Sequence, residues 1–388
     1  MNSLDGMAAA KLKGLEKLHL RRELKVSDRR PDAIIERDGR QYISFSCNDY
    51  LNLSHDPRVI EAAVRATQLF GAGAGASRLV TGNHPLLAEL EERLAHLKGA
   101  EDCIVFGSGY LANIGILPAL VGSNDLILAD ELSHACLLSG AKLSGAKTVM
   151  FRHNDMAHLE ELLAAHRGEH PHCLVVTDGV FSMDGDLAPL PDMAALCERF
   201  DAWLLTDDAH GVGVVGGGRG SSFAFGEKVE VPLQMGTLSK AIGGYGGYLC
   251  ASRPVIDLMR NRARTFVFST GLPPSAVAAA IAALNIIESE PKYCKRPVDL
   301  ARLFCWQMRL PAPQSPIVPL IVGEAEKALQ LSHALAEEGF LVAAIRPPTV
   351  PRGTARLRFT FTARQREEDV ERLTECLHRL LPEGVKTA

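Results

Sequence analysis

Between residues 50 and 250, short apolar runs alternate with longer stretches of helical character. The apolar runs lie at residues 102–106, 125–129, 147–151, 172–177, 202–206 and 231–235. The helical stretches include residues 57–70, 85–98, 109–121, 155–166 and 190–201. Short apolar runs separated by helices are typical of βαβ units, whose parallel strands are buried on both faces of the sheet. The sequence therefore predicts an α/β protein with a mainly parallel central sheet.

Three units are expected along the 388 residues. Residues 1–49 contain a predicted amphipathic helix at 8–25 and a short hairpin around Asp38-Gly39. Residues 50–272 form the predicted large domain. Pro273-Pro274 interrupts the alternation, and residues 273–388 are expected to form a smaller α+β domain. Its predicted strands lie at 317–322, 340–345 and 355–361, and its predicted helices include 325–338 and 366–380.

Composition and charge exclude several classes of protein. The 42 basic and 46 acidic residues leave a net charge of −4, which gives no electrostatic reason to bind nucleic acid or a membrane surface. The N-terminus has no apolar signal region, and no apolar run is long enough to cross a bilayer. The nine cysteines are scattered without a CxxC motif, which favours a reducing cytoplasm. No residues have the spacing of a metal site, so no metal is expected.

The placement of the 34 glycines is uneven. Four clusters lie at residues 71–76, 107–109, 211–220 and 236–247. Glycine is favoured where a turn needs a positive φ or where a ligand approaches the main chain. Tight turns in a large α/β protein are the alternative explanation for any one cluster. Four clusters together favour a small-molecule site built partly from backbone.

Two groups of reactive side chains follow predicted strands. Asp207 ends one apolar run, and His210 comes three residues later. Open parallel sheets bind ligands at the carboxyl ends of their strands. An N-cap aspartate and a surface histidine are the alternative. Lys240 and Thr237 follow the next run, where the amine could form an imine and the hydroxyl could bind a phosphate. A solvated loop lysine is the alternative there.

The joint pattern resembles the fold-type I pyridoxal-phosphate enzymes, and more narrowly the α-oxoamine synthases. The resemblance covers nearly the whole chain. The matching strings are NDYL at Asn48–Leu51, GAGASRLVTGNH at Gly73–His84, GSGYLAN at Gly107–Asn113, ELSHA at Glu131–Ala135, TDGVFSMDGD at Thr177–Asp186, DDAHGVG at Asp207–Gly213, GTLSKAIGGYGGY at Gly236–Tyr248 and RPPTVPRGTARLR at Arg346–Arg358.

The resemblance implies pyridoxal 5'-phosphate as the cofactor, with catalytic roles for four side chains. Lys240 would carry the cofactor and move the substrate's α-proton. Asp207 would pair with the ring nitrogen and keep it protonated. His134 would stack on the ring and lie beside the substrate. His210 and Ser182 would hydrogen-bond the ring hydroxyl oxygen.

The phosphate of the cofactor would be held at a helix start. Gly109 and Tyr110 open a predicted helix, whose free backbone N–H groups suit an anion. Thr237 would add its hydroxyl. The resemblance also implies a homodimer with sites at the interface. Ser269 and Thr270 would then reach the phosphate bound by a partner subunit.

The last string most resembles the family member that condenses L-alanine with a pimeloyl thioester in biotin biosynthesis. Arg358 would hold the amino-acid carboxylate, for which a bidentate guanidinium is suited. Arg346 and Thr349 match positions near the substrate. Arg21 would meet the distal pimeloyl carboxylate, and a solvated helix charge is the alternative. Asn48 would lie near the thioester, and an Asx turn is the alternative.

Two positions depart from the family pattern. Asp178 stands where the family usually has Glu, and Asn52 stands where it usually has Gly. Other members use glycine or serine with different thioesters, and they remain the nearest alternative. A nucleotide-dependent oxidoreductase is disfavoured because the glycine-rich run at residues 71–76 follows a predicted helix and not a strand. A non-enzymatic binding protein would have no need to combine Lys240, Asp207, His210 and His134.

Overall fold

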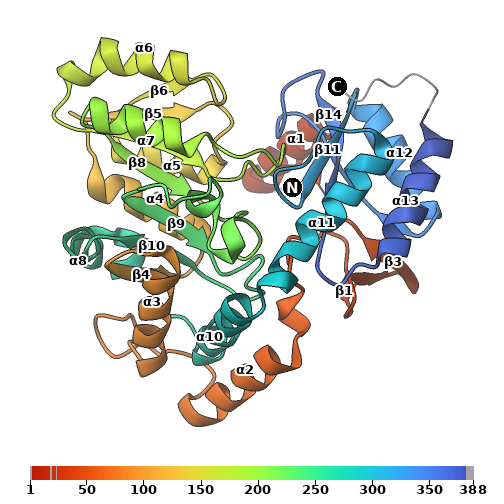
Figure 1. Ribbon diagram of the computed structural model, residues 1–388, viewed down its shortest axis with the longest axis horizontal. Helices are drawn as coiled ribbons and strands as arrows, with labels where there is room; N and C mark the ends of the chain where they lie inside the picture. The colour runs from red at the N-terminus through yellow and green to blue at the C-terminus, as the bar shows by residue number, and fades with distance from the viewer. Residues whose placement is uncertain (1, 18–19, 23, 382–388) are drawn as a thin grey trace.

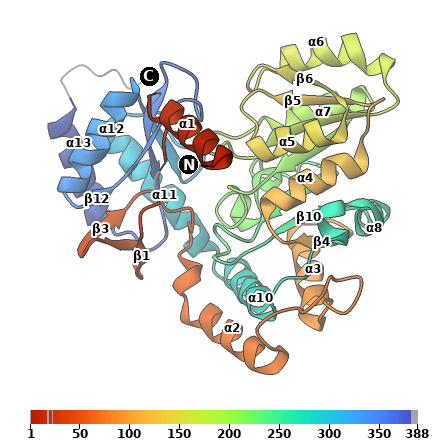
Figure 2. The same ribbon diagram turned by 180° about the vertical axis from the view of Figure 1, so that it is seen from behind.

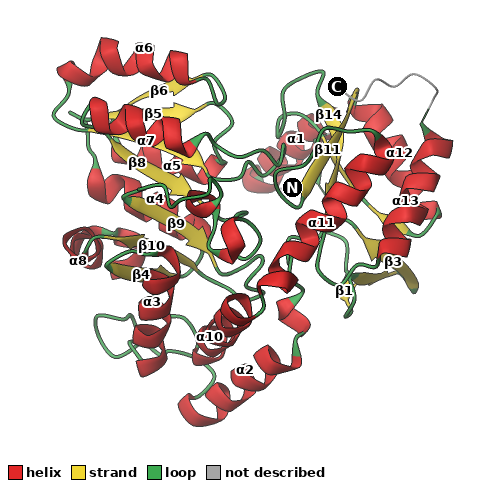
Figure 3. Cartoon of the chain, in the orientation of Figure 1, coloured by secondary structure: helices red, strands yellow, loops and turns green. Residues whose placement is uncertain are grey.

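The computed structural model describes residues 2–17, 20–22 and 24–381. Two lobes lie side by side in Figure 1, one around a large sheet and one around smaller sheets. Helix α11 (Pro291–Met308) runs from the first lobe into the second. Loops at the ends of several large-sheet strands face the small lobe (Figure 3).

The large sheet has seven strands in the order β4-β10-β9-β8-β7-β5-β6. They are β4 (Asp102–Phe106), β5 (Leu126–Asp130), β6 (Lys147–Phe151), β7 (Cys173–Asp178), β8 (Trp203–Asp207), β9 (Leu233–Thr237) and β10 (Gly247–Ala251). All six predicted runs are strands, and the mainly parallel α/β fold is confirmed. Strand β10, antiparallel to both neighbours, was not predicted because its glycine-rich start resembles a loop.

Helices cover both faces of this sheet. They include α3 (Pro85–Lys98), α4 (Gly109–Leu120), α5 (Ala135–Ser144), α6 (Met156–His166), α7 (Leu190–Arg199), α8 (Arg253–Arg262), α9 (Arg264–Val267) and α10 (Pro274–Ser289). Helix α2 (Pro57–Phe70) packs on α10, outside the layer that covers the sheet. Successive strand residues point to opposite faces. Ile104 of β4 packs with α4, whereas Val105 packs with α3 and α10. The continuous apolar runs therefore match burial on both sides.

The small lobe joins both ends of the chain. One sheet contains β1 (Asp28–Arg29), β2 (Ile34–Arg37), β3 (Arg40–Ser44) and β12 (Phe340–Leu341). The other contains β11 (Ile317–Gly323), β13 (Ala343–Ile345) and β14 (Ala355–Thr360). Helices α12 (Ala325–Glu337) and α13 (Glu367–Leu380) pack with α11 over an aromatic core. The hairpin turn is confirmed at Asp38-Gly39, where both residues have positive φ.

The predicted division of the chain into units 1–49, 50–272 and 273–388 stays a prediction. Two contacts show which of these units pack together. Strand β3 pairs with β12, so the first unit shares a sheet with the last. Helix α10 packs against α2 and α3, on the side of the large sheet.

The N-terminal helix differs from the predicted one. Helix α1 spans Ser3–Lys17 rather than 8–25, and the described residues from 20 to 27 are not helical. Residues 18, 19 and 23 of the predicted helix lie outside the described ranges. The helix buries none of its residues fully, so core packing does not fix its length. The helix lies beside the small lobe (Figure 2), and its Leu12 and Leu15 line a hollow together with residues 344–349. No helix in the described ranges is long and apolar enough to cross a membrane.

Candidate active site

Carboxylates gather where two neighbouring strands of the large sheet end. Strand β7 ends at Asp178 and β8 ends at Asp207, and the two residues are paired in the strand register. Both side chains are buried. Strand β9 ends alongside at Thr237, and Lys240 follows in the next turn. The tertiary structure thus brings the two predicted groups together at one edge of the sheet, where α/β folds bind ligands.

Lys240 lies in a chain of polar contacts. Its Nζ is 2.8 Å from Nε2 of His210, and Nδ1 of His210 is 2.6 Å from the Tyr50 hydroxyl. Burial lowers the pKa of Lys240, against the opposing effect of the Asp207 carboxylate. Burial and the neighbouring Lys240 hold the pKa of His210 well below its ordinary value. A lysine with a lowered pKa can serve as a nucleophile and a base near neutral pH.

The small lobe contributes a buried arginine to the same edge. Both terminal nitrogens of Arg358, on β14, donate to Oδ1 of Asn48, at 3.2 and 3.3 Å. Its Nε donates to the carbonyl of Ser182. The Tyr50 hydroxyl lies 3.4 Å from the same Asn48 oxygen. Three predicted residues from distant parts of the chain therefore meet beside the Lys240 contacts.

The Asp207 carboxylate is held by two donors. Nδ2 of Asn113 donates to its Oδ2 at 2.7 Å, and the Ala209 N–H donates to its Oδ1 at 3.0 Å. A buried carboxylate oriented in this way suits a protonated ring nitrogen as its third partner.

Asp178, one of the two departures from the family pattern, has a clear structural role. Its Oδ1 accepts the backbone N–H of His134 at 3.0 Å. His134 in turn is the N-cap of α5, where its Nδ1 accepts the N–H of Cys136. The shorter carboxylate therefore still reaches and orients the residue expected to stack on the cofactor.

Asn52, the other departure, has φ 52°, in the left-handed region. Asparagine tolerates that region better than most residues other than glycine. Its Oδ1 also accepts the N–H of Arg364 at 3.1 Å. The substitution therefore keeps the backbone conformation that a glycine would adopt.

The start of α4 has the features of a phosphate cradle. Ser108 caps the helix, and its Oγ accepts the Leu111 N–H at 3.1 Å. The first-turn N–H groups of Gly109 and Tyr110 have no carbonyl in a preceding turn to bond. A Cβ at Gly109 would lie 3.4 Å from Oγ1 of Thr237, so a side chain there would fill the space beside this hydroxyl. These donors, with Asp207 and Lys240, fit pyridoxal phosphate.

Ser269 and Thr270 lie beside the segment 76–78. Thr270 forms a β-bridge with Ser77, and Gly271 N–H donates to the Ala76 carbonyl at 3.0 Å. Ser269 and Thr270 line a small hollow with Arg78. Their suggested role toward a partner subunit stays a prediction.

The remaining three substrate candidates meet in a separate cavity. Arg21, Arg346 and Thr349 line a hollow of ≈ 700 Å³ that α1 partly covers. Arg21 also forms an ion pair with Glu16. Arg358 does not line this hollow, so the predicted substrate residues form two groups.

Sequence reasoning missed three residues of the site. Tyr50 and Asn113 lie within the matching strings and Cys136 directly follows one, but none was assigned a role. Asn113 stands four residues after Gly109, so helical spacing alone places it on the face of Gly109. The pairing of Tyr50 with His210 joins residues 160 positions apart and has no local signal.

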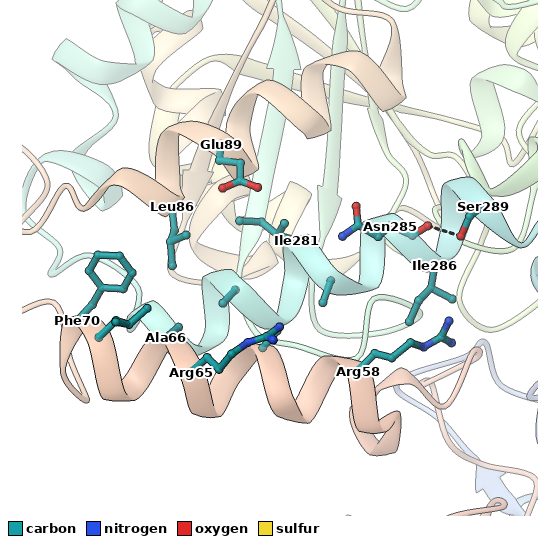
Figure 4. A pocket seen from close by; sticks show the side chains of 14 residues that line it. Arg58, Arg65, Ala66, Phe70, Leu86, Glu89, Ile281, Asn285, Ile286 and Ser289 are labelled. Atoms are coloured by element: carbon teal, nitrogen blue, oxygen red, sulfur yellow. Dashed lines mark hydrogen bonds between the residues drawn. The ribbon is translucent and has the colours of Figure 1, made fainter.

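A further hollow between α2 and α10 lies outside this site (Figure 4). Its volume is ≈ 420 Å³, and Arg58, Arg65 and Asn285 line it. Arg58 is already engaged by Asp56 and Glu290. None of the predicted site residues lines this hollow.

Comparisons with known proteins agree with the geometry. Residues 40–377 match the family model "Aminotransferase class I and II". The 8-amino-7-oxononanoate synthase of Methylocella silvestris is 64% identical, covering 89% of this chain and 99% of the relative. A serine palmitoyltransferase variant from S. paucimobilis with bound PLP and myriocin superimposes with TM-score 0.90 at 28% identity, covering 98% and 99%. An 8-amino-7-oxononanoate synthase from Francisella tularensis gives TM-score 0.74 at 27% identity, covering 87% and 97%.

Proposed function

Because this chain belongs to the class I and II aminotransferase family, and its relatives include 8-amino-7-oxononanoate synthases, we propose that it is a pyridoxal-phosphate-dependent acyltransferase of biotin biosynthesis. It condenses L-alanine with a pimeloyl thioester to give 8-amino-7-oxononanoate, CO₂ and the free thiol. The observation that carries the proposal is the run of polar contacts from Lys240 through His210 and Tyr50 to Asn48 and Arg358. A lysine with a lowered pKa and a buried arginine at one site support the roles of base and carboxylate-binding group.

Bound pyridoxal phosphate supplies an electron sink for the negative charge that develops on Cα of alanine. Lys240 removes the proton from that carbon and later returns one. Its lowered pKa favours the neutral amine, the form in which Nζ can accept a proton. Asp207 keeps the proton on the ring nitrogen, because Asn113 and Ala209 fix its carboxylate as an acceptor.

Arg358 would bind the alanine carboxylate. Its guanidinium is buried, and both of its terminal nitrogens donate to Oδ1 of Asn48. A substrate carboxylate could take the place of this oxygen and accept the same two hydrogen bonds. Loss of this carboxylate as CO₂ then frees the arginine again.

The cavity with Arg21, Arg346 and Thr349 would receive the far end of the acyl chain. Its wall includes apolar Leu12, Leu15 and Leu20, which suit methylene groups, while the arginines suit the distal carboxylate. The N-terminal helix would thereby help to select a dicarboxylic acyl group.

We further propose a homodimer in the cytoplasm. Exposed apolar side chains lie at Leu79 and Val80, in the segment that bridges to Thr270, and at Phe268, directly before Ser269. A second copy packed there would bury these side chains and bring both hydroxyl groups near the other site.

Mass spectrometry of the product from alanine and pimeloyl-coenzyme A tests the reaction. We expect the mass of 8-amino-7-oxononanoate, and low turnover when glycine or serine replaces alanine. A product formed preferentially from glycine or serine would instead identify another branch of the family. The acyl end is tested with Arg21→Gln, which should raise KM for pimeloyl-coenzyme A but not for heptanoyl-coenzyme A. Lys25→Gln is the matched control, because Lys25 does not line the cavity.

A further inference from the structure

A buried thiol lies against His134, and the mechanism above gives it no task. Sγ of Cys136 is 2.7 Å from Nδ1 of His134. Cys136 is 2% exposed, and it lies one residue inside the start of α5. Burial and the Asp207 carboxylate raise the pKa of this thiol to about 12, so it keeps its proton at neutral pH.

The helix cap supplies one of two donors to a nitrogen of His134. The backbone N–H of Cys136 donates to Nδ1 at 3.3 Å. A backbone amide can only donate, so this contact favours the tautomer whose Nδ1 offers its lone pair and whose proton resides on Nε2. The thiol lies closer to Nδ1, at 2.7 Å, so we expect it to strengthen the preference that the cap begins.

Asn113 turns the thiol toward the same nitrogen. One N–H of its side-chain amide donates to Oδ2 of Asp207 at 2.7 Å, and Nδ2 also lies 3.0 Å from Sγ of Cys136. With its two N–H groups assigned to these acceptors, the amide donates to the sulfur. The S–H group then needs an acceptor other than Asn113. Nδ1 of His134 lies 2.7 Å from the sulfur and Oδ2 of Asp207 lies 3.9 Å from it, so Nδ1 is the nearer acceptor.

We propose that Asn113 and Cys136 are positioning residues that fix His134 as the neutral tautomer with its proton on Nε2. His134 then presents an N–H donor to a substrate oxygen, and it does not act as a base through Nε2. This use of the donor rests on the proposed function, whereas the tautomer itself does not.

The charges around His134 agree with a neutral ring. Enclosure lowers the pKa of His134, the Asp207 carboxylate raises it, and Lys240 lowers it. Asp178 contacts the main-chain N–H of His134. Protonation of Nδ1 would also displace two donors, the Cys136 N–H and the Cys136 thiol.

The test is ¹⁵N NMR of histidine-labelled protein without cofactor, with His134→Gln to assign the His134 signals. We expect Nδ1 of His134 to show the shift of an unprotonated nitrogen and Nε2 that of a protonated one. Cys136→Ala should raise the share of the other tautomer, and Cys136→Ser, which keeps a donor, should restore the wild-type spectrum. Cys305→Ala removes a buried thiol from the small lobe and should leave His134 unchanged.

A wild-type spectrum with a proton on Nδ1, or no difference between Cys136→Ala and wild type, would overturn the proposal. With cofactor bound, Cys136→Ala should lower kcat about fivefold, the effect of one hydrogen bond, with little change in KM for alanine. An unchanged kcat would refute the use of the donor. If the enzyme condenses none of the tested substrates, the proposed function fails, but the NMR result still decides the tautomer.

Discussion

Nζ of Lys240 lies 2.8 Å from Nε2 of His210, and the hydroxyl of Tyr50 lies on the other side of the same ring. Burial lowers the pKa of both Lys240 and His210, so each is favoured in its neutral form. When the proton of neutral His210 resides on Nε2, Tyr50 donates to Nδ1 and Nε2 donates to the amine; in the other tautomer Nδ1 donates to Tyr50 and the amine donates to Nε2. The lysine is thereby oriented before any ligand arrives.

Replacing Lys240 with alanine should lower kcat by about 10⁴-fold or more, because both the nucleophile and the proton-transfer group are lost. The visible absorbance of lysine-bound cofactor should also be missing after pyridoxal phosphate is added. Steady-state kinetics and an absorbance spectrum measure both effects. Lys295→Ala, at an exposed position of α11, is the control and should match wild type. Normal turnover by Lys240→Ala would refute the assignment.

Tyr50→Phe should destabilise the protein by about 1–3 kcal/mol, because it leaves Nδ1 of His210 buried without its partner. Tyr248→Phe is a matched control. Tyr248 is equally buried, but its hydroxyl has no hydrogen-bond partner within the described part of the chain. Its removal should be neutral or stabilising. Urea unfolding of both variants without cofactor measures the difference, and equal losses would contradict the assigned hydrogen bond.

Asp178→Asn should stabilise the cofactor-free protein increasingly as the pH rises. Burial and the Asp207 carboxylate raise the pKa of Asp178 well above its ordinary value of 3.8. The folded protein therefore favours the protonated carboxyl more than the unfolded chain does. The stability of the folded protein is fully present below pH 3.8, and part of it is lost as the pH rises through the folded-state pKa. The amide of asparagine can still accept the His134 N–H without that loss. Unfolding free energies from pH 5 to 9 provide the measurement, with exposed Asp192→Asn as control. A stability difference that does not change with pH would count against the raised pKa.

Lys98→Met should cost about 3–5 kcal/mol of stability, because it strands a buried charge. Nζ of Lys98 lies 2.7 Å from Oδ2 of Asp208, and both residues are fully buried. The double variant Lys98→Met with Asp208→Asn should recover part of the loss, since no unpaired charge remains. Guanidinium unfolding measures both, with exposed Lys327→Met as control. A loss below about 1 kcal/mol in the single variant would show that the pair is not buried as described.

The buried Lys98–Asp208 pair also explains two glycines of the cluster at residues 211–220, whose role the sequence pattern left open. A Cβ at Gly220 would lie 1.7 Å from Oδ2 of Asp208, and one at Gly211 would lie 2.0 Å from its Oδ1. Gly220 also has φ +103°. These two glycines make room for a buried carboxylate, and this carboxylate follows Asp207 directly in the chain. A sequence pattern shows that glycine is needed there but not which atom approaches it.

Much of the fold was predictable because it is local. Six of the seven large-sheet strands coincide with apolar runs, since strands buried on both faces must be apolar throughout. Strand β10 was missed because four of the five residues from Gly243 to Gly247 are glycines. The end of α1 was also misplaced, because a helix without buried residues carries no packing signal. Helices such as α3, whose leucines enter the core, were placed correctly.

The sequence by itself determined the order of the strands along the chain, the mainly parallel sheet and the set of reactive side chains. Those features depend on local periodicity and on motifs of a few residues. Only the tertiary structure decided which side chains meet. Arg358 reaches Asn48 across 310 positions because β14 ends beside the segment that follows β3, where the Thr360 N–H donates to the Phe45 carbonyl. Contacts of this kind depend on how two separately packed cores fit together, which no local pattern records.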